Sequence, residues 1–270
     1  MEPNSLQIFL NKNRCINNFT HTSMGTPKGK YKIKCGDIVK FYDLYYKHVF
    51  ENNLPAYLTE SIKDCDYTPL RINIDLNYYN KNPIRVYTRE DIDKICLLYM
   101  NKIEEYLEEL EDFERTFYIL EKPLPTYEVD NIGNTKKNKL LVKDGFHIIA
   151  PNIIINNYLH IKFRDFACKN CPDFLDRYSF SNSYDNIFDR RVIFGRHWQM
   201  YGSTKPEKSP YLVTRAIRVF KDRVEYIEKI PDNKDLIQLL SVRNKTEYSM
   251  LKTGVEEEVF NCQTKKEKKK

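Results

Sequence analysis

The chain has 270 residues, of which 41% are hydrophobic, so it can bury a substantial core as one large domain or as two lobes. Its 20 tyrosines and 15 phenylalanines, against only 8 glycines, argue against low-complexity disorder over most of the length. The formal net charge of +6 only weakly favours a polyanionic partner, because slightly basic soluble proteins are common.

Cysteine usage and the N-terminal residues bear on the compartment. The seven cysteines are an odd number at irregular spacings. The start, Met1-Glu-Pro-Asn4, lacks the basic-then-apolar pattern of a signal peptide, and no run of about 18 apolar residues could span a bilayer. We therefore expect an intracellular protein that is neither secreted nor inserted in a membrane.

The predicted elements of the first half alternate between helix and strand. Residues 1–36 combine turn signals with short apolar pieces. The helix expected at 88–110 is the clearest element, because Thr88 and Asp91 form a capping-box pattern ahead of a long apolar stripe. We expect it to pack on a sheet and to carry no chemistry. The other elements predicted here are strands at 31–34, 69–79 and 116–121 and a helix at 37–50.

The second half continues this alternation. It is expected to contain a polar loop at 123–139 and a long strand at 140–155 that Pro151 interrupts. A charged tail at 256–270 is predicted to be disordered, as an end or a linker, which leaves 1–255 as the folded domain. The interleaved elements favour an α/β or α+β fold. The remaining predictions are a helix at 157–169, a mixed aromatic segment at 192–202, strands at 211–220 and 224–227, and a helix at 232–242.

Three segments carry groups that could bind a metal and a nucleotide, and the first is the strand at 69–79. Its residues Asn73, Asp75 and Asn77 project from one face, because residues two apart on a strand share a face. A Mg²⁺ or Mn²⁺ ion bound with a triphosphate prefers hard oxygen ligands, which carboxylates and amides provide. The alternative is that these polar residues merely alternate along a solvated strand face.

The second segment is the strand at 140–155, which presents Lys143, Gly145 and His147 on one face. Lysine supplies a positive charge for a phosphate, and glycine allows close backbone approach. Imidazole can donate a hydrogen bond to a phosphate oxygen. The alternative is a structural histidine with satisfied hydrogen bonds, which is common at the start of a strand.

The third segment adds a further carboxylate, and several cations follow it. Basic clusters are usually solvated surface, but the aromatic residues and the Gly-Ser turn between these cations favour a shaped pocket. The residues concerned are Asp189, Arg190, Arg191, Arg196 and Lys205.

Taken together and in this order, the three segments resemble the signature motifs of the archaeo-eukaryotic primase superfamily, the primase–polymerases. That pattern is an Asp-x-Asp/Glu strand, a small-residue-x-His strand and a hydrophobic-Asp pair. They appear here as Ile72-Asn-Ile-Asp75, Gly145-Phe-His147 and Phe188-Asp189. Over roughly residues 20–245, the sequence resembles the N-terminal primase portion of the primase–helicases of nucleocytoplasmic large DNA viruses. Four sequence segments make the resemblance to this viral group more specific: Tyr57-Leu-Thr-Glu60, Asp144-Gly-Phe-His-Ile148, Trp198-Gln-Met-Tyr-Gly-Ser-Thr-Lys-Pro206 and Leu236-Ile-Gln-Leu-Leu-Ser-Val-Arg243.

The resemblance implies a primase fold with an N-terminal α/β lobe, a C-terminal RRM-like lobe and the active site between them. It implies a DNA-dependent primase or primase–polymerase that makes short primers from nucleoside triphosphates on a single-stranded DNA template, by two-metal nucleotidyl transfer in viral DNA replication. Such a protein would act in the host cytoplasm or a viral replication compartment. Asp75 and Asp189 would bind Mg²⁺ or Mn²⁺, and the nucleotide-binding residues would be Lys143, Gly145, His147 and Lys205.

The chain departs from the family pattern at one catalytic position. Aligning Asn73 with the family's first Asp places Asp75 at the second, whereas a shift of two residues would pair Asp75 with Asn77. In either register an amide replaces one metal-binding carboxylate and removes a negative charge from the site. Two other functions therefore stay open: a catalytically impaired nucleic-acid-binding replication scaffold, and an unrelated metal-dependent nuclease.

Other partners are judged from motifs that are incomplete or missing. Cys168-x-x-Cys171, with His160 upstream, has only half of a zinc spacing, so we do not expect zinc. The sequence contains no Gly-x-x-x-x-Gly-Lys-Ser/Thr loop, so a helicase domain or subunit would lie on another chain or on an absent C-terminal region. The basic loops at 28–34 and 190–196 are candidates for contacting the template backbone.

Overall fold

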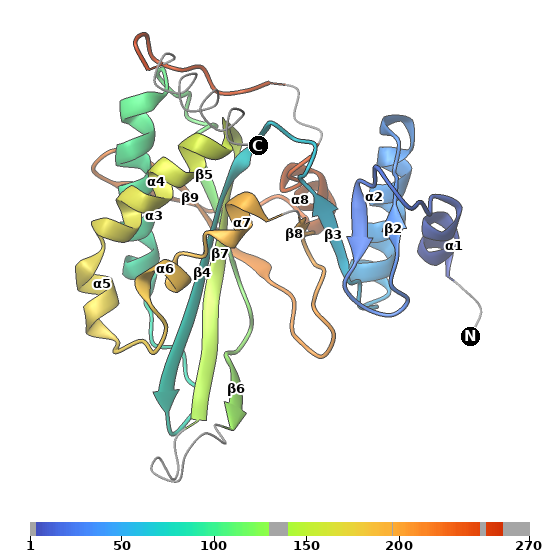
Figure 1. Cartoon of the computed structure of the whole chain (residues 1–270), viewed down its shortest axis with the longest axis horizontal. Helices are drawn as coiled ribbons and strands as arrows, with labels where there is room; N and C mark the ends of the chain where they lie inside the picture. The colour runs from blue at the N-terminus through green and yellow to red at the C-terminus, as the bar shows by residue number, and fades with distance from the viewer. Residues whose placement is uncertain (1–3, 130–139, 196, 244–246, 256–270) are drawn as a thin grey trace.

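Two antiparallel sheets form the framework of the molecule, and Figure 1 shows them side by side. The computed structural model describes residues 4–129, 140–195, 197–243 and 247–255. The smaller sheet has the strand order β2 (Lys30–Tyr31), β1 (His21–Ser23), β3 (Leu58–Ser61) and β8 (His197–Gln199). The larger sheet has the order β10 (Val224–Ile227), β9 (Leu212–Val219), β5 (Thr116–Glu121), β7 (Leu140–Asn156) and β4 (Tyr67–Asn80), and β6 (Thr126–Val129) also pairs with β7.

Helices cover one face of the smaller sheet. A continuous hydrophobic cluster joins this face to three helices, α1 (Ser5–Lys12), α2 (Ile38–Tyr46) and α8 (Asn233–Leu239). The strand register places four buried residues in one row across this face, namely Tyr31, His21, Glu60 and Trp198. A 3-10 turn at Cys35–Asp37 precedes α2, and a π-helical turn at Lys47–Glu51 follows it.

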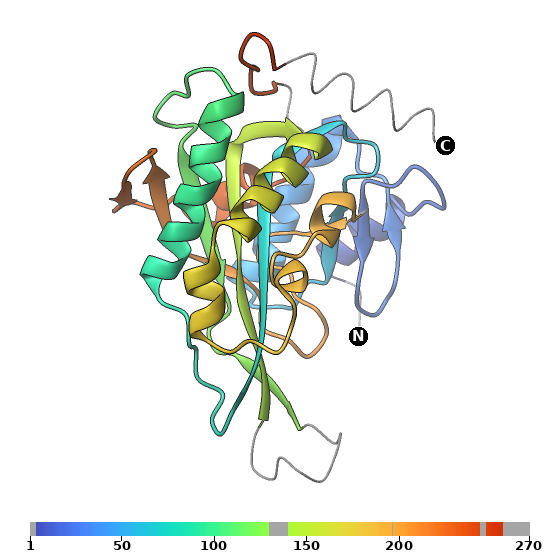
Figure 2. The same cartoon turned by 60° about the vertical axis from the view of Figure 1, so that its left-hand side comes forward.

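The larger sheet is covered by α3 (Arg89–Tyr106) and α4 (Asn157–Lys169), which lie side by side across its long strands in Figure 2. The side chains beneath these helices form a second hydrophobic cluster, in which Ile72 and Ile74 of β4 pair with Ile148 and Phe146 of β7. The alternate residues of both strands face away from this core. Three short helices follow α4 in the chain: α5 (Pro172–Arg177), α6 (Tyr184–Ile187) and α7 (Arg191–Phe194).

The capping box predicted for the clearest helix is present. The Thr88 hydroxyl accepts a hydrogen bond from the Asp91 backbone N–H, and the Asp91 carboxylate accepts one from the Thr88 backbone N–H at 2.9 Å. As expected, α3 packs on a sheet. The helix ends at Tyr106, earlier than the predicted end at residue 110, although Leu110 is still buried in the core.

Several local predictions in the N-terminal region were wrong. Residues Ser5–Lys12 form a helix where turns and short apolar pieces were expected, and Asn4 caps it by accepting a hydrogen bond from the backbone N–H of Gln7 at 3.0 Å. The strand expected at 31–34 is only Lys30–Tyr31. In the helix predicted at 37–50, the hydrophobic Val39 is 66% exposed and does not face the core.

Two predictions in the middle of the chain also need correction. The described part of the polar loop expected at 123–139 contains the strand β6, which pairs with β7. Pro151 does not interrupt β7, because it lies in an irregular stretch of the ladder. Pro69 is opposite Ile154 and Leu70 is opposite Ala150. The ladder therefore skips Pro151, which has no N–H to donate. The tail expected to be disordered at 256–270 lies outside the described residues.

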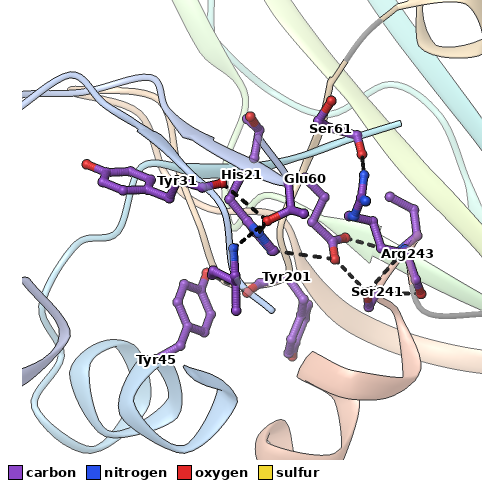
Figure 3. Close-up of polar contacts among 12 residues, drawn as sticks. His21, Tyr31, Tyr45, Glu60, Ser61, Tyr201, Ser241 and Arg243 are labelled. Carbon is purple, nitrogen blue, oxygen red and sulfur yellow. Dashed lines mark hydrogen bonds and ion pairs between the residues drawn. The ribbon is translucent and has the colours of Figure 1, made fainter. Parts of the chain in front are cut away.

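A buried polar cluster joins residues 241–243 to the smaller sheet (Figure 3). The Glu60 carboxylate accepts hydrogen bonds from the Ser241 hydroxyl and from the Val242 backbone N–H, the latter at 2.9 Å. Burial and the Arg243 charge lower the pKa of His21 to about 3, so its ring next to Glu60 is neutral. Arg243 donates to the Ser61 carbonyl. Two of the segments that support the family resemblance, 57–60 and 236–243, are therefore in contact here and stabilise the fold.

The fold is mixed α and β, as the sequence indicates. The two sheets are not consecutive in the chain, because β8 and α8 return to the smaller sheet after the larger one has begun. Within the described residues, none of the helices combines the length and the apolar character that a membrane span needs.

Candidate nucleotide and metal site

The first two sequence motifs lie opposite each other on neighbouring strands. In the β4–β7 ladder, Asn73 pairs with His147 and Asp75 pairs with Gly145. Directly paired residues of an antiparallel ladder project from the same face of the sheet. The candidate metal-binding and phosphate-binding motifs therefore form one continuous surface, on the face turned away from α3 and α4.

Gly145 is required by the close approach of the two strands. Its φ of +142° is a backbone conformation that residues with a side chain rarely adopt. A Cβ atom there would lie 2.0 Å from the Ile74 carbonyl oxygen. Gly145 was expected to allow close approach of a nucleotide, but here it allows close approach of the β4 backbone. This close approach sets the distance between the two motifs.

The third motif lies along the free edge of β4. Phe188 forms a bridge with Ile74, and the Asp189 backbone N–H donates to the Asn73 carbonyl at 3.0 Å. Arg164 of α4 holds this segment in place, since its guanidinium donates to the Phe188 carbonyl at 2.9 and 2.7 Å. Asp189 is therefore placed beside Asn73 although it is distant in the chain.

The two predicted metal-binding carboxylates converge on one amide. The Asn73 Nδ2 donates to the Asp75 Oδ2 at 3.2 Å and to the Asp189 Oδ2 at 3.4 Å. Of the two alignment registers left open by the sequence, the structure places Asn73, rather than Asn77, between the acids. The Asn73 Oδ1 is buried and has no hydrogen-bond partner within the described residues.

The two carboxyl groups have opposite electrostatic surroundings. Burial and the neighbouring Asp189 charge raise the pKa of Asp75, and Lys205, Arg191 and the Asn73 amide offset only part of this effect. For Asp189, burial also acts to raise the pKa. However, hydrogen bonds from the Arg191 guanidinium and backbone N–H, both at 2.9 Å, outweigh it and lower the pKa below the ordinary value.

These donors suit a divalent cation of the Mg²⁺ or Mn²⁺ class. Two carboxylates face one point, and the unpartnered Oδ1 of Asn73 is a hard oxygen that could turn toward a cation by rotation of the amide. Within the described residues no group of three or more His, Cys, Asp and Glu side chains could hold a metal. The set is therefore two acids and one amide oxygen.

The three residues considered for zinc in the sequence lie in other parts of the fold. Cys168 lies in α4 and Cys171 precedes α5, while His160 is buried against the Thr68 hydroxyl.

A cavity of about 900 Å³ opens between the two sheets and contains this constellation. The larger sheet contributes the β4 and β7 residues described above, and the smaller sheet contributes Thr22, Thr59 and Gln199. Ligand-binding cavities are commonly of this size. The cavity therefore brings side chains of both sheets around the predicted site residues.

Positively charged side chains line the same cavity. Burial and the nearby Lys205 charge lower the pKa of Lys122. Lys122 follows β5 and was missed by the sequence analysis, because a lysine at the end of a strand carries no distinctive pattern. The cavity-lining cations are Lys122, Lys143, Arg191, Lys205 and Lys208.

A tightly bonded turn presents Lys205 to the cavity. The Ser203 hydroxyl accepts a hydrogen bond from the Leu58 backbone N–H at 3.0 Å and is hydrogen-bonded to the Tyr45 hydroxyl at 2.8 Å. Gly202 has a φ of +79°, and a Cβ there would lie 2.6 Å from the Phe50 ring. The Gly-Ser turn noted in the sequence therefore fixes the backbone that leads to Lys205.

His147 lies between two aromatic rings on the cavity wall. Its ring stacks on Tyr211, with the centroids 3.9 Å apart, and lies 4.9 Å from the Trp198 ring. Burial, together with the Lys122 and Lys205 charges, lowers the pKa of His147 to about 3. At neutral pH the imidazole is uncharged, so it would meet a phosphate as a hydrogen-bond donor and not as a cation. Tyr211, its stacking partner, was also missed by the sequence analysis.

The fold and the site together define the class of protein. Residues 20–217 match the model of the family described as "C962R protein N-terminal AEP domain", where AEP denotes archaeo-eukaryotic primase. The chain belongs to this family, and the membership predicted from its motifs is confirmed.

The relatives found among curated proteins are viral. The chain is 29% identical over 212 residues to "Putative helicase L207/L206" of Acanthamoeba polyphaga mimivirus, an alignment that covers 77% of this chain and 21% of the relative. It is 24% identical over 219 residues to "Putative helicase 184R" of Invertebrate iridescent virus 6, which covers 73% of this chain and 21% of the relative. It is 26% identical over the same length to "Putative helicase 121R" of Invertebrate iridescent virus 3, with the same coverages. The chain thus spans about a fifth of the length of these relatives.

Proposed function

We propose that this chain is a DNA-dependent primase or primase–polymerase domain that makes short primers from nucleoside triphosphates in viral DNA replication. The observation that carries the proposal is the meeting of two carboxylates at Asn73 in a cavity that is also lined by several lysines and a neutral histidine. A metal-bound triphosphate needs both kinds of group in one place.

Each group has a separate task in this proposal. Asp75 and Asp189 hold the divalent cation, and Asn73 contributes its amide oxygen. The cation would supply charge neutralisation at the phosphates and activation of the primer 3′-oxygen. Lys122, Lys143 and Lys205 bind the triphosphate, and His147 donates a hydrogen bond to a phosphate oxygen. Site residues from both sheets keep the nucleotide between the lobes.

Four finer features belong to the same proposal. The larger sheet would be the RRM-like lobe of the family. The two-metal form of nucleotidyl transfer would require the Asn73 amide to do part of the work of a carboxylate. The domain would act together with a helicase, because the relatives of which it spans about a fifth are named as helicases. It would act in the host cytoplasm or in a viral replication compartment.

A second function is favoured by one observation. The amide at position 73 removes a negative charge at the point where two carboxylates meet, which weakens cation binding. The chain would then bind nucleic acid as a replication scaffold without making primers.

A primer-synthesis assay separates these functions. The parent chain and the Asn73→Asp variant are incubated with a single-stranded DNA template, nucleoside triphosphates and Mg²⁺ or Mn²⁺, with Asp189→Ala as the inactive control. Primers made by the parent chain support the proposed function. Primers made only by Asn73→Asp would favour the scaffold, and degradation of the template without incorporation of nucleotide would favour a nuclease.

A further inference from the structure

The smaller sheet has a polar face opposite its helix-covered face. The strand register places Lys30, Thr22, Thr59 and Gln199 in one row across all four strands. The Thr22 and Thr59 hydroxyls are hydrogen-bonded to each other at 2.7 Å. Three of the four residues line the cavity, and only Lys30, on the edge strand, lies beyond it. The row therefore leads from the cavity to the outer edge of the sheet.

An aromatic pair lies at the rim of the cavity beside this polar face. The rings of Phe19 and His197 stack, with centroids 5.8 Å apart and planes at 15°. His197 is exposed and lines the cavity, and Phe19 is half-buried. The Lys30 ammonium lies 5.0 Å from the Phe19 ring centroid. Aromatic rings and a cation are thus presented together where the cavity meets solvent.

Further cations continue along the edge strand and the residues that follow it. Lys30, Lys32 and Lys34 are exposed, whereas the intervening Tyr31 and Ile33 are buried in the core. Exposed lysines thus alternate with buried side chains along this segment, so the three lysines point away from the core. Within the described residues, none of the three forms an ion pair with a carboxylate. Unpaired cations in a row beside an aromatic pair form a surface that is complementary to a flexible polyanion with flat bases.

We propose that this surface, made by Phe19, His197, Lys30, Lys32 and Lys34, binds single-stranded nucleic acid and leads it into the cavity. An unpaired base stacks on the Phe19–His197 pair, and the phosphates contact the lysines. A single strand fits better than a duplex, because stacking on a side chain requires a base that is not already paired and stacked. The inference rests on the proposed function, since it supplies the strand that would be copied.

Fluorescence anisotropy with a fluorescein-labelled deoxythymidine oligonucleotide tests the surface on the full chain. Phe19→Ala and Lys30→Ala are each expected to lower the affinity about fivefold or more. Lys30→Ala should also reduce the slope of log affinity against log salt by about 0.7, which is the effect of one lost phosphate contact on a single strand. The matched controls are Phe113→Ala, at a phenylalanine that is 62% exposed, and Lys221→Ala, at an exposed lysine in the β9–β10 turn. Both should stay within about twofold of the parent chain.

Two further measurements keep this test separate from folding and from the proposed function. The Phe19→Tyr variant keeps a stacking ring and should retain the parent affinity, and the exposed Lys32 and Lys34 can be replaced without disturbing the core. Nucleotide binding, followed through the fluorescence of Trp198 (the single tryptophan) in the cavity, should be unchanged by Phe19→Ala. Oligonucleotide affinities that are equal in Phe19→Ala and Phe113→Ala would overturn the proposed surface. The surface would stand even if no variant made primers, provided that the pattern of oligonucleotide affinities holds.

Discussion

The side-chain amide of Asn73 donates a hydrogen bond to the Asp189 carboxylate across 3.4 Å and so joins the first motif to the third. The same amide donates to Asp75. These two hydrogen bonds offset part of the repulsion between the Asp75 and Asp189 carboxylates. Asn73 therefore connects the two carboxylates, as a shared metal ion would. However, its neutral side chain gives the site less negative charge for binding a cation than an aspartate would.

The first prediction concerns the charge at position 73. Asn73→Asp should increase the affinity for Mn²⁺ about tenfold or more, because ligand charge strongly influences cation binding in an oxygen-ligand site. Without metal the same variant should melt at a lower temperature than the parent chain, since three acids then share the site. Titration followed by Mn²⁺ electron paramagnetic resonance, with thermal melts with and without the ion, measures both effects. Unchanged Mn²⁺ affinity would contradict a metal site at this point.

The second prediction uses the opposite pKa shifts of the two acids. The pKa of Asp75 is raised in the folded chain, so its ionisation opposes folding, and the stability that it contributes at low pH is lost as the pH rises through the folded pKa. Asp75→Asn should therefore raise the metal-free melting temperature at pH 7 by about 2 °C. The gain should vanish below the ordinary aspartate pKa of 3.8.

Asp189 provides the matched control for that measurement. Its pKa is lowered in the folded chain, so its charge contributes stability that is present at neutral pH and is lost as the pH falls through the folded pKa. Asp189→Asn should lower the melting temperature at pH 7 and have little effect at low pH. If both variants changed the melting temperature at pH 7 in the same direction, the opposite pKa shifts of Asp75 and Asp189 would be contradicted.

The faces of the site strands could be predicted from the sequence because they depend on a local period. Asn73 and Asp75 alternate with buried aliphatic residues on β4, and His147 lies between the buried Phe146 and Ile148 on β7, so each motif indicated its own face. The resemblance to a family then predicted that the three motifs form one site. What the local pattern could not provide was the register between β4 and β7, which is fixed by long-range pairing and by Gly145.

Other parts of the site depend on contacts that leave no local signal. Asp189 reaches Asn73 because Arg164, on a different helix, holds the carbonyl of the preceding residue. Lys122 lines the cavity near Lys205, which is distant from it in the chain. The strand β6 was missed because it is short and pairs with a single strand within the described residues. The positions of Asp189 and Lys122 therefore depend on segments that are distant in the chain, whereas β6 pairs with the next strand of the chain.

The third prediction concerns the neutral imidazole. His147→Ala should weaken binding of a non-hydrolysable nucleoside triphosphate about five- to tenfold, as expected for the loss of one hydrogen bond to a charged group. Affinity for a single-stranded oligonucleotide should change little. Because the pKa of His147 is about 3, its protonation should add no pH dependence to nucleotide binding between pH 5.5 and 8. Isothermal titration calorimetry measures these affinities, and equal losses for nucleotide and oligonucleotide would contradict the phosphate role.

The fourth prediction concerns Lys122, which the motifs did not indicate. Burial and the nearby Lys205 charge lower the pKa of Lys122, and a polyanion bound beside these two side chains would offset the effect of the Lys205 charge. Lys122→Ala should therefore weaken triphosphate binding about tenfold, and it should weaken nucleoside monophosphate binding much less, because fewer phosphate charges are present. Lys221→Ala, at an exposed lysine remote from the cavity, is the matched control. Calorimetry at two salt concentrations completes the test, since the loss should shrink at high salt, where the same contact is screened. An equal loss for mono- and triphosphate would place Lys122 at the sugar or base instead of the phosphate chain.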